Sequence, residues 1–359
     1  MSLTHNFSAG PAKLPEPVLE RAQAELRDWQ GRGVSVMEIS HRSDAFMALR
    51  NQAEDSLRAL LAVPDDYDIL FLQGGATLQF AMTALNLSTP TDTIDFAITG
   101  SWGRKAIAEA SRFATGHAAA TLDFDGLVPD VEAWSLSEQA AYCHYTPNET
   151  IDGVEFHVTP KLPDDVPLVA DFSSSILSRP IDVSEHALIY AGAQKNIGPA
   201  GLTVVILRRA LMPARRDGIP ELMNYQVHSQ AQSLRNTPPT FAWYLAGLVF
   251  EWLQAQGGLD VMAQRNQQKA ELLYRALDAS EFYTAPVPPL ARSRMNVIFR
   301  LTDESLQKRW LAEAEAAGLL GLKGHRSVGG LRASLYNAVS LDSVRVLVDF
   351  LTDFEARCG

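Results

Sequence analysis

Apolar residues in the first two thirds of the chain fall in short runs, and segments with helical spacing separate several of them. The runs are apolar at successive positions, which is typical of strands in a parallel sheet that helices cover on both faces. The expected strands span residues 68–73, 93–99, 140–145, 167–173, 187–194 and 202–207. The expected helices span residues 17–30, 44–63, 74–87 and 100–113. The pattern therefore predicts an α/β fold.

The pattern changes after residue 239. Two long helices, 240–256 and 259–280, are expected to meet at Gly257-Gly258. The remainder predicts strands at 294–301 and 331–336 and helices at 305–318 and 341–357, which indicates a smaller α+β domain. We place the boundary near residue 256. The large domain spans residues 16–256, and the small domain combines residues 257–359 with an N-terminal arm, residues 1–15.

Length and composition are those of a globular protein: 359 residues, 47% hydrophobic and 20% charged. No apolar run approaches the roughly 20 residues that cross a bilayer, and the N-terminus lacks the pattern of a signal peptide. The two cysteines, Cys143 and Cys358, indicate neither a disulfide framework nor a metal site. We therefore expect a cytoplasmic protein with reduced thiols, no bound metal and no membrane contact.

The net charge is −11, which disfavours a nucleic-acid partner because such a partner requires a basic face. The same charge constrains the substrate. An anionic substrate would be repelled by the protein as a whole, so a few local arginines and histidines would have to attract it.

Ligands of open α/β sheets bind beyond the carboxyl ends of the strands, so the residues that follow each expected strand are candidates for a site. Strand 68–73 leads into Gly74-Gly75-Ala76-Thr77, a turn whose amides suit a phosphate, although it can equally be a plain strand-to-helix turn. Trp102 follows strand 93–99 and offers an aromatic face, unless it is a core residue. Residues 146–150 form a polar turn for which solvent exposure is the alternative.

Two further strand ends carry an acid and an amine. Asp171 ends a very apolar strand, where a carboxylate is costly unless it is paired with a cation or caps a helix. Lys195 lies in "AGAQKNIGPAG", among small uncharged residues and between two apolar strands. Pyridoxal phosphate needs this set of groups: a lysine for its aldehyde, a carboxylate for its ring nitrogen, an aromatic stacking face and amides for its phosphate.

Eight motifs together closely resemble the phosphoserine aminotransferase family. They are "NFSAGPAKLP", "HRS", "GGATLQF", "YTPNETIDG", "ADFSSSILSRPIDV", "GAQKNIGPAG", "RNTPPTF" and "GHRSVGGLRASLYNAV". The resemblance runs from residue 6 to about residue 340. It implies the fold type I architecture, with a mostly parallel seven-stranded sheet in the large domain and a smaller α+β C-terminal domain. It also implies pyridoxal 5'-phosphate as cofactor, and a homodimer with two sites at the subunit interface.

The resemblance assigns cofactor roles residue by residue. Lys195 is the Schiff-base lysine and proton shuttle, Asp171 pairs with the ring nitrogen, and Trp102 stacks on the ring. Thr150 lies beside the ring hydroxyl. The phosphate is held by Ala76, Thr77 and Gln194, and by Asn236 and Thr237, which resemble residues that reach the phosphate of the partner subunit's cofactor.

The resemblance also implies how substrates are held. Arg332 clamps the α-carboxylate that both substrates share, since a guanidinium pairs with a carboxylate through two parallel hydrogen bonds. The distal phosphate or carboxylate is bound by two His-Arg pairs, which would supply the local positive charge that an acidic protein needs. These pairs are His41 with Arg42, contributed by the other chain, and His325 with Arg326.

Two positions depart from the family pattern, which often has arginine at position 77 and serine at position 9. Here they are Thr77 and Ala9, so a phosphate or substrate contact is lost or replaced. The implied reaction is reversible transamination of 3-phosphohydroxypyruvate with L-glutamate, giving O-phospho-L-serine and 2-oxoglutarate, in L-serine biosynthesis. The resemblance leaves open a second role with a related keto acid in pyridoxal phosphate biosynthesis.

Three alternative functions fit the sequence less well. A cysteine desulfurase of the same fold needs a cysteine on a mobile loop, whereas Cys143 lies in an expected strand and Cys358 at the extreme C-terminus. An alanine–glyoxylate type aminotransferase would not explain two His-Arg pairs. A non-catalytic protein that keeps the cofactor could lose its lysine, carboxylate or arginine, but Lys195, Asp171 and Arg332 are all present.

Overall fold

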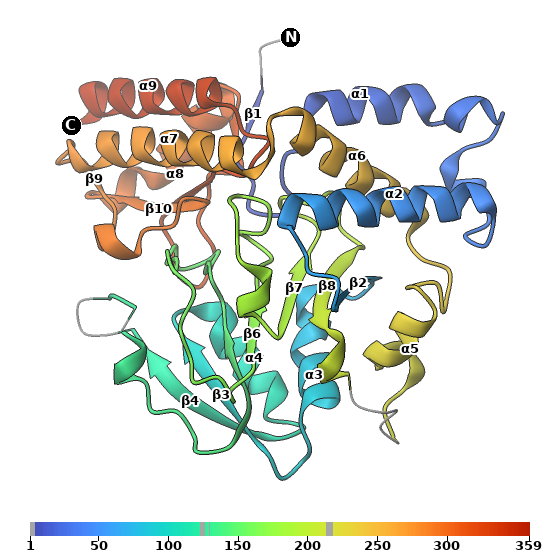
Figure 1. The fold of residues 1–359 in the computed structure, drawn as a ribbon. Coiled ribbons are helices and arrows are strands. Elements are labelled where there is room, and N and C mark those ends of the chain that lie inside the picture. The colour runs from blue at the N-terminus through green and yellow to red at the C-terminus, as the bar shows by residue number, and fades with distance from the viewer. Residues whose placement is uncertain (1–3, 123–125, 129, 213–217) are drawn as a thin grey trace.

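The computed structural model describes residues 4–122, 126–128, 130–212 and 218–359. Its centre is a seven-stranded sheet in the order β2-β8-β7-β6-β5-β3-β4 (Figure 1). The strand β8 is antiparallel to both of its neighbours, and the other strand pairs are parallel. The strands are β2 (Tyr67–Leu72), β3 (Thr93–Ile98), β4 (Thr115–Thr121), β5 (Ala140–Tyr145), β6 (Leu168–Asp171), β7 (Leu188–Gly192) and β8 (Thr203–Arg208).

This mostly parallel sheet confirms the fold expected from the sequence. Within this sheet the pattern missed β4, whose sequence TGHAAAT is small and mixed rather than β-branched. Since β2, β3, β5, β6 and β7 run in one direction, their carboxyl ends lie at one edge of the sheet.

Each strand alternates its side chains between two apolar layers. In β2, Ile69 and Phe71 join the buried cluster that contains α2 and α6, while Leu70 and Leu72 join the cluster that contains α3 and α4. This explains the continuous apolar runs, because both faces of the sheet are covered. The covering helices are α2 (Asp44–Leu61), α3 (Gly75–Leu87), α4 (Ser101–Ala110) and α6 (Thr240–Ala255).

The first predicted helix is shorter than expected. The helix α1 spans Glu16–Glu25 rather than reaching residue 30. The chain then turns through left-handed conformations at Gln30 and Gly31, and Trp29 is buried with its ring 6.5 Å from that of Tyr244. Burial of the Trp29 indole against α6 therefore ends the helix early. A short helix that the pattern missed, α5, spans Tyr225–Gln230.

The smaller domain surrounds a third buried cluster, which includes Phe7, Phe299 and Trp310. Figure 1 shows its long helices α7 and α9 side by side with α8 nearby. Its elements are α7 (Gly258–Asp278), β9 (Tyr283–Thr284), β10 (Asn296–Leu301), α8 (Gln307–Ala316), β11 (Leu319–Leu320), β12 (Leu331–Ser334) and α9 (Leu341–Cys358). The arm strand β1 (His5–Asn6) pairs with β11. The boundary at residue 256 stays a prediction.

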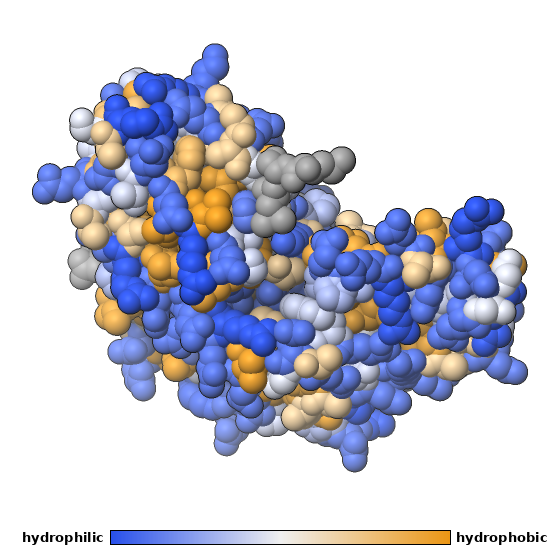
Figure 2. Space-filling model, turned by 90° about the horizontal axis from the view of Figure 1, so that it is seen from above, coloured by the Kyte–Doolittle hydropathy of each residue, from blue (hydrophilic) through white to orange (hydrophobic). Residues whose placement is uncertain are grey.

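Single turns of 3-10 helix connect several of these elements. They lie at Trp29–Gly31, Val36–Glu38, Val131–Ala133, Val183–Glu185, Arg209–Leu211, Glu221–Met223, Pro289–Ala291 and Glu304–Leu306. In the part of the chain that the structure describes, no helix combines the length and the apolar character needed to cross a membrane. Seen from above, the molecule has a bent outline and a mostly hydrophilic face interrupted by hydrophobic patches (Figure 2).

Candidate active site

Lys195 lies in the turn after β7 and is buried. Its Nζ donates a hydrogen bond to the Oγ1 of Thr150 at 2.6 Å. Burial lowers the pKa of Lys195 to about 8, although the negative charge of Asp171 partly opposes the shift. The turn thus places a primary amine, less basic than a surface lysine, at the carboxyl edge of the sheet.

Asp171 is the last residue of β6 and is also buried. Its Oδ1 accepts a hydrogen bond from the backbone N–H of Ser173 at 2.9 Å. Burial raises the pKa of Asp171, whereas the bond from Ser173 and the charge of Lys195 lower it. The Ser173 hydroxyl accepts the N–H of Gly192 at 3.0 Å, which joins the ends of β6 and β7. The carboxylate is therefore held rigidly near the amine.

Trp102 occupies the first turn of α4, directly after β3. The Nζ of Lys195 lies 5.8 Å from the centroid of the Trp102 ring. The backbone N–H groups of Trp102 and Gly103 both donate, at 2.8 Å, to the carboxylate of Glu149. Burial raises the pKa of Glu149 to about 8, and these two amide bonds oppose the shift. An aromatic face therefore lies beside the amine, held by a buried carboxyl group.

Residues 146–150 are not an exposed turn, because Thr146, Asn148, Glu149 and Thr150 are all buried. That alternative is wrong. The sequence contained the signal, since a run of polar residues directly after an apolar strand lies at the edge of the sheet where ligands bind.

The turn between β2 and α3 has the form of a phosphate-binding loop. Gly74 and Gly75 have φ values of 93° and 66°, which favour glycine. The N–H of Gly75 is already bonded to the Oγ1 of Thr203 at 2.8 Å. The amides of Ala76 and Thr77 in the first turn of α3 have no carbonyl one turn earlier and remain available to an anion. Ala76 is half-buried and Thr77 is exposed.

The other three residues expected at a phosphate, Gln194, Asn236 and Thr237, each lie in or beside a segment that contacts the end of a strand. The side chain of Gln194 is so close to Gly192 that a Cβ on that glycine would lie 2.8 Å from the Gln194 Oε1. Gln73, at the end of β2, donates to the carbonyl of Thr237 at 3.3 Å, which holds the Asn236-Thr237 segment beside the loop after β2 in the same chain. Both residues of that segment are at least partly accessible.

Arg332 reaches the site from β12 of the smaller domain. Its Nη1 donates to the carbonyl of Thr150 at 3.1 Å. Its Nε is buried and has no hydrogen-bond partner among the described residues, and burial lowers the pKa of the guanidinium. A half-buried cation with an unused, buried donor indicates an anionic ligand.

The pair His325 and Arg326 lies in the loop before β12. The imidazole Nδ1 of His325 is 2.7 Å from the hydroxyl of Ser327. Partial burial lowers the pKa of His325, and the positive charges of Arg332, Lys105 and Arg326 lower it further. The structure therefore places the pair close to Arg332. Lys105 is a basic residue that the sequence analysis missed, and its Nζ lies 4.1 Å from the Trp102 ring centroid.

The second pair, His41 and Arg42, directly precedes α2, whose first turn is capped by the Ser43 hydroxyl. Among the described residues, no hydrogen bond joins either side chain to the groups around Lys195, and the buried Nε2 of His41 has no partner. Arg42 is exposed. Within one chain, the structure does not bring this pair to the site.

Ala9, one of the two departures, lies beside Tyr336, whose hydroxyl donates to the Ala9 carbonyl at 2.9 Å. The backbone at position 9 thus remains connected to the segment that follows Arg332. Replacement of a serine hydroxyl by a methyl group does not remove this contact.

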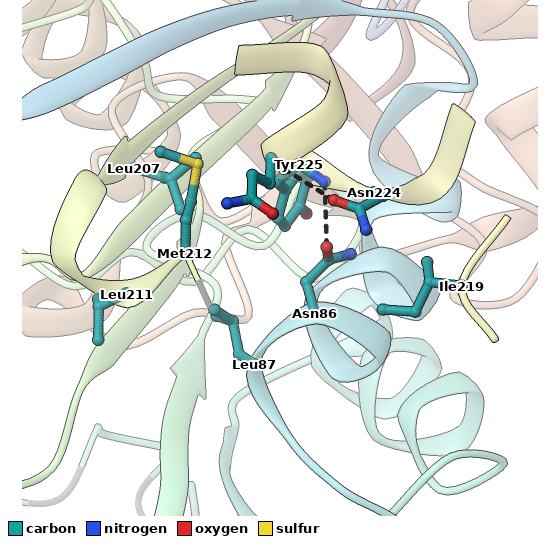
Figure 3. A pocket seen from close by; sticks show the side chains of 9 residues that line it. Asn86, Leu87, Leu207, Leu211, Met212, Ile219, Asn224 and Tyr225 are labelled. Atoms are coloured by element: carbon teal, nitrogen blue, oxygen red, sulfur yellow. Dashed lines mark hydrogen bonds between the residues drawn. The ribbon is translucent and has the colours of Figure 1, made fainter. Parts of the chain in front are cut away.

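One enclosed cavity lies away from these groups. Figure 3 shows it lined by residues that include Asn86, Leu207 and Tyr225, with the N–H of Tyr225 bonded to the Oδ1 of Asn86 at 3.0 Å. Leu207 pairs with Leu188, the first residue of β7, so the cavity lies at the edge of the sheet opposite Lys195. Its volume is about 10 Å³, enough for roughly one water molecule.

A buried amine, a fixed carboxylate, an aromatic face and free helix amides fit the aldehyde, ring nitrogen, ring and phosphate of pyridoxal phosphate. Fold and site together define a pyridoxal-phosphate-dependent enzyme of the aminotransferase type. The family model "Aminotransferase class-V" matches residues 4–347.

Known proteins are similar over nearly the whole chain. A phosphoserine aminotransferase of Stutzerimonas stutzeri is 57% identical over 356 residues, covering 99% of this chain and 98% of that protein. One from Pseudomonas aeruginosa (strain LESB58) is 56% identical, with the same coverage. The solved phosphoserine aminotransferase from Bacillus circulans subsp. alkalophilus is 45% identical, with a TM-score of 0.97 and 99% of each chain covered.

A pyridoxal-phosphate-bound phosphoserine aminotransferase from Trichomonas vaginalis is 39% identical, with a TM-score of 0.93, and covers 98% of this chain and 100% of its own. The chain belongs to the phosphoserine aminotransferase family within the class-V aminotransferases. An alanine–glyoxylate aminotransferase from Nostoc sp. is 18% identical with a TM-score of 0.74, and this likeness concerns the fold alone.

Proposed function

We propose that the protein is a phosphoserine aminotransferase, which interconverts 3-phosphohydroxypyruvate and L-glutamate with O-phospho-L-serine and 2-oxoglutarate in L-serine biosynthesis. The observation that carries the proposal is the convergence of two cations on Thr150. Its hydroxyl accepts from Lys195, and its carbonyl accepts from Arg332. Thr150 thus holds both Lys195, which serves the amino end of a substrate, and Arg332, which serves its carboxylate. Transamination of an α-amino acid requires these two groups close together.

Bound pyridoxal phosphate supplies an aldehyde for the substrate amine and a ring that delocalises the electrons released at Cα. The Nζ of Lys195 is the base that accepts the Cα proton and later returns it. A pKa of about 8 suits this task, because a useful fraction of the amine is neutral near physiological pH. The bond to Thr150 fixes the direction of the amine.

Asp171 holds a proton on the ring nitrogen through its carboxylate, which Ser173 keeps in place. The Trp102 ring supports the flat ring of the cofactor. The amides of Ala76 and Thr77, with Gln194, would hold the phosphate, and Asn236 and Thr237 would reach the phosphate of the partner subunit's cofactor. Except for Asn236 and Thr237, which lie between α5 and α6, these groups come from the end of a strand or from the turn or first helical turn that follows it, so together they would hold the cofactor in a defined orientation.

Arg332 binds the α-carboxylate shared by all four substrates, and His325 and Arg326 bind the distal phosphate or carboxylate. The pair His41 and Arg42, which among the described residues has no hydrogen bond to the groups around Lys195 of its own chain, completes the distal anion site of a second copy. The protein therefore acts as a homodimer. Partly exposed apolar side chains near α1 suit such an interface: Leu19, Leu26, Val34 and Met37 are each at least 40% exposed. The fold and composition fit a cytoplasmic location.

The test is a single half-reaction followed by the visible absorbance of the bound cofactor. O-Phosphoserine, glutamate, serine, alanine or cysteine is added alone, without a keto acid. We expect only phosphoserine and glutamate to convert the cofactor to its pyridoxamine form, and we expect no conversion in Lys195→Ala. Equal conversion by serine or alanine would contradict the substrate assignment. Absence of any cofactor spectrum in the wild-type protein would contradict the cofactor site itself.

A further inference from the structure

Glu149 is fully buried, and both of its carboxylate oxygens are occupied by the first turn of α4. The N–H of Trp102 donates to Oε2 and that of Gly103 to Oε1, each at 2.8 Å. The carboxylate comes from the segment after β5, whereas α4 follows the neighbouring strand β3. One side chain therefore joins two strand ends through the backbone of the residue that carries the indole.

The residue that precedes α4 provides no side-chain cap, and the Glu149 carboxylate bonds to the first turn of the helix in its place. Helices usually begin with Ser, Thr, Asp or Asn, but α4 begins after Gly100. A Cβ on Gly100 would lie 2.5 Å from the Cδ and Cγ of Glu149, closer than any real contact. Gly100 has a φ of −174°, so the restriction is steric rather than conformational. The space that a side chain would occupy is used by Glu149.

A conventional cap would be less costly at this terminus. Asp152, whose side chain is 19% exposed, accepts the N–H of Ser101 at 2.7 Å. Burial raises the pKa of Glu149 to about 8, which reflects the cost of placing that charge in the interior. A group that only stabilised the helix could remain partly solvated as Asp152 does. The fully buried Glu149 carboxylate, bonded to the Trp102 N–H, instead fixes the position of the Trp102 backbone.

The adjacent residue, Thr150, joins Glu149 to the catalytic groups. Its hydroxyl accepts from Lys195 and its carbonyl accepts from Arg332. The dipeptide Glu149-Thr150 thus contacts the backbone of the stacking residue, the amine and the arginine. A shift at any of these contacts would be transmitted to the others.

We propose that Glu149 is a positioning residue, which sets the orientation of the Trp102 ring relative to the amine of Lys195 and hence relative to the cofactor that these two residues would hold. This inference rests on the proposed function, because Trp102 is taken to stack on pyridoxal phosphate. The carboxylate acts through the α4 backbone, since both of its oxygens accept from backbone N–H groups of that helix.

The test is Glu149→Gln, which keeps the length of the side chain but leaves one oxygen for two N–H donors. We expect the dissociation constant for pyridoxal phosphate to rise roughly tenfold or more, because one buried backbone N–H is left without an acceptor. We also expect the visible circular dichroism of the bound cofactor to change in the holoenzyme. The matched control is Asp152→Asn at the same helix terminus. An asparagine still offers an oxygen to the Ser101 N–H, and the ion pair that it removes is with Arg104, whose side chain is 60% exposed, so both quantities should stay near wild type.

A merely structural role is distinguished by a double-mutant cycle with Trp102→Phe. If Glu149 acts through the indole, Glu149→Gln changes the dissociation constant and the dichroism much less in the Trp102→Phe background. Additive effects would overturn the proposal, and so would a Glu149→Gln protein that binds cofactor as tightly as wild type with an unchanged spectrum.

If Glu149→Gln does not fold, Glu149→Asp replaces it, because it keeps two acceptor oxygens on a shorter side chain. We then expect a folded protein with altered dichroism, and an unchanged spectrum overturns the proposal. Failure of the proposed function is separate, since it would appear in the wild-type protein as a lack of cofactor binding or of conversion by phosphoserine and glutamate.

Discussion

The Nζ of Lys195 donates to the Oγ1 of Thr150 across a strand that separates them. Lys195 follows β7 and Thr150 follows β5, while β6, which ends at Asp171, lies between these strands. The Lys195 side chain therefore extends past the end of β6, which carries the Asp171 carboxylate. This arrangement brings a base and a ring-nitrogen partner to one place without a direct hydrogen bond between them, which leaves the amine free to exchange protons.

The buried amine should make stability depend on pH. The pKa of Lys195 is about 8 in the folded protein and 10.5 ordinarily, so the unfolded chain binds more protons between these values and stability rises with pH across that window. We expect Lys195→Met to stabilise the apoprotein by on the order of 2 kcal/mol below pH 8, after allowing for the lost bond to Thr150. The advantage should vanish as the pH approaches about 10.5.

Urea unfolding at pH 7 and pH 10 measures this difference. Lys308→Met, which replaces an exposed lysine of α8, is the matched control and should show no such pH dependence. A constant difference between Lys195→Met and wild type at both pH values would show that the amine is not perturbed by burial.

The hydroxyl of Thr150 should be needed for catalysis more than for folding. Thr150→Val keeps the shape of the side chain but removes the acceptor for Lys195. We expect kcat of the phosphoserine half-reaction to fall roughly tenfold, which corresponds to one buried hydrogen bond, while the melting temperature changes little. Thr150→Ser retains the hydroxyl and should recover most of the rate. Equal rates in Thr150→Val and Thr150→Ser would remove Thr150 from the mechanism.

Arg332 and the His325-Arg326 pair should affect the two amino donors differently. Arg332→Lys replaces a planar fork with a point charge, so we expect KM for phosphoserine and glutamate to rise by similar factors, about tenfold or more. Arg326→Ala should raise the KM for the two donors unequally, because one distal group is a phosphate and the other a carboxylate. Steady-state kinetics with each donor decides between these patterns, and equal increases in Arg326→Ala would refute the distal role.

Gly100 should not tolerate a methyl group. In Gly100→Ala the added Cβ would lie 2.5 Å from Glu149 and 2.7 Å from the Oδ2 of Asp152. We expect a loss of stability of about 1–3 kcal/mol together with weaker cofactor binding, since the carboxylate must move. The control is Gly247→Ala within α6, where the only contact of the new Cβ is the Ala53 Cβ at 3.4 Å.

Gly247→Ala should be neutral or slightly stabilising, because alanine favours a helix. Thermal unfolding and a cofactor titration compare the two variants. Similar behaviour of both would mean that the end of β3 relaxes without disturbing Glu149.

Much of the candidate site could be predicted from the chain because parallel strands bring their carboxyl ends together. Once the apolar runs are assigned as strands, Asp171, Trp102 and the Gly74-Gly75 turn must lie at one edge. Features that depend on one side chain meeting another were not predictable in this way. Residues 146–150 were expected as a polar turn with solvent exposure as the alternative, and no role was expected for Glu149, because nothing in "TPNET" shows that its carboxylate enters the space left by Gly100.

The sequence by itself determined the alternating layers, the chemistry at each strand end and the family, because these depend on local periodicity and on short motifs. The tertiary structure decided which groups meet. Arg332 and Thr150 are 182 residues apart and come from different parts of the fold, yet a 3.1 Å hydrogen bond joins them. Such contacts arise from the packing of domains and loops, which no local pattern encodes. For the same reason, the sequence shows that His41 and Arg42 form a basic pair. Only the tertiary structure shows that, among the described residues, the pair has no hydrogen bond to the groups around Lys195 of its own chain.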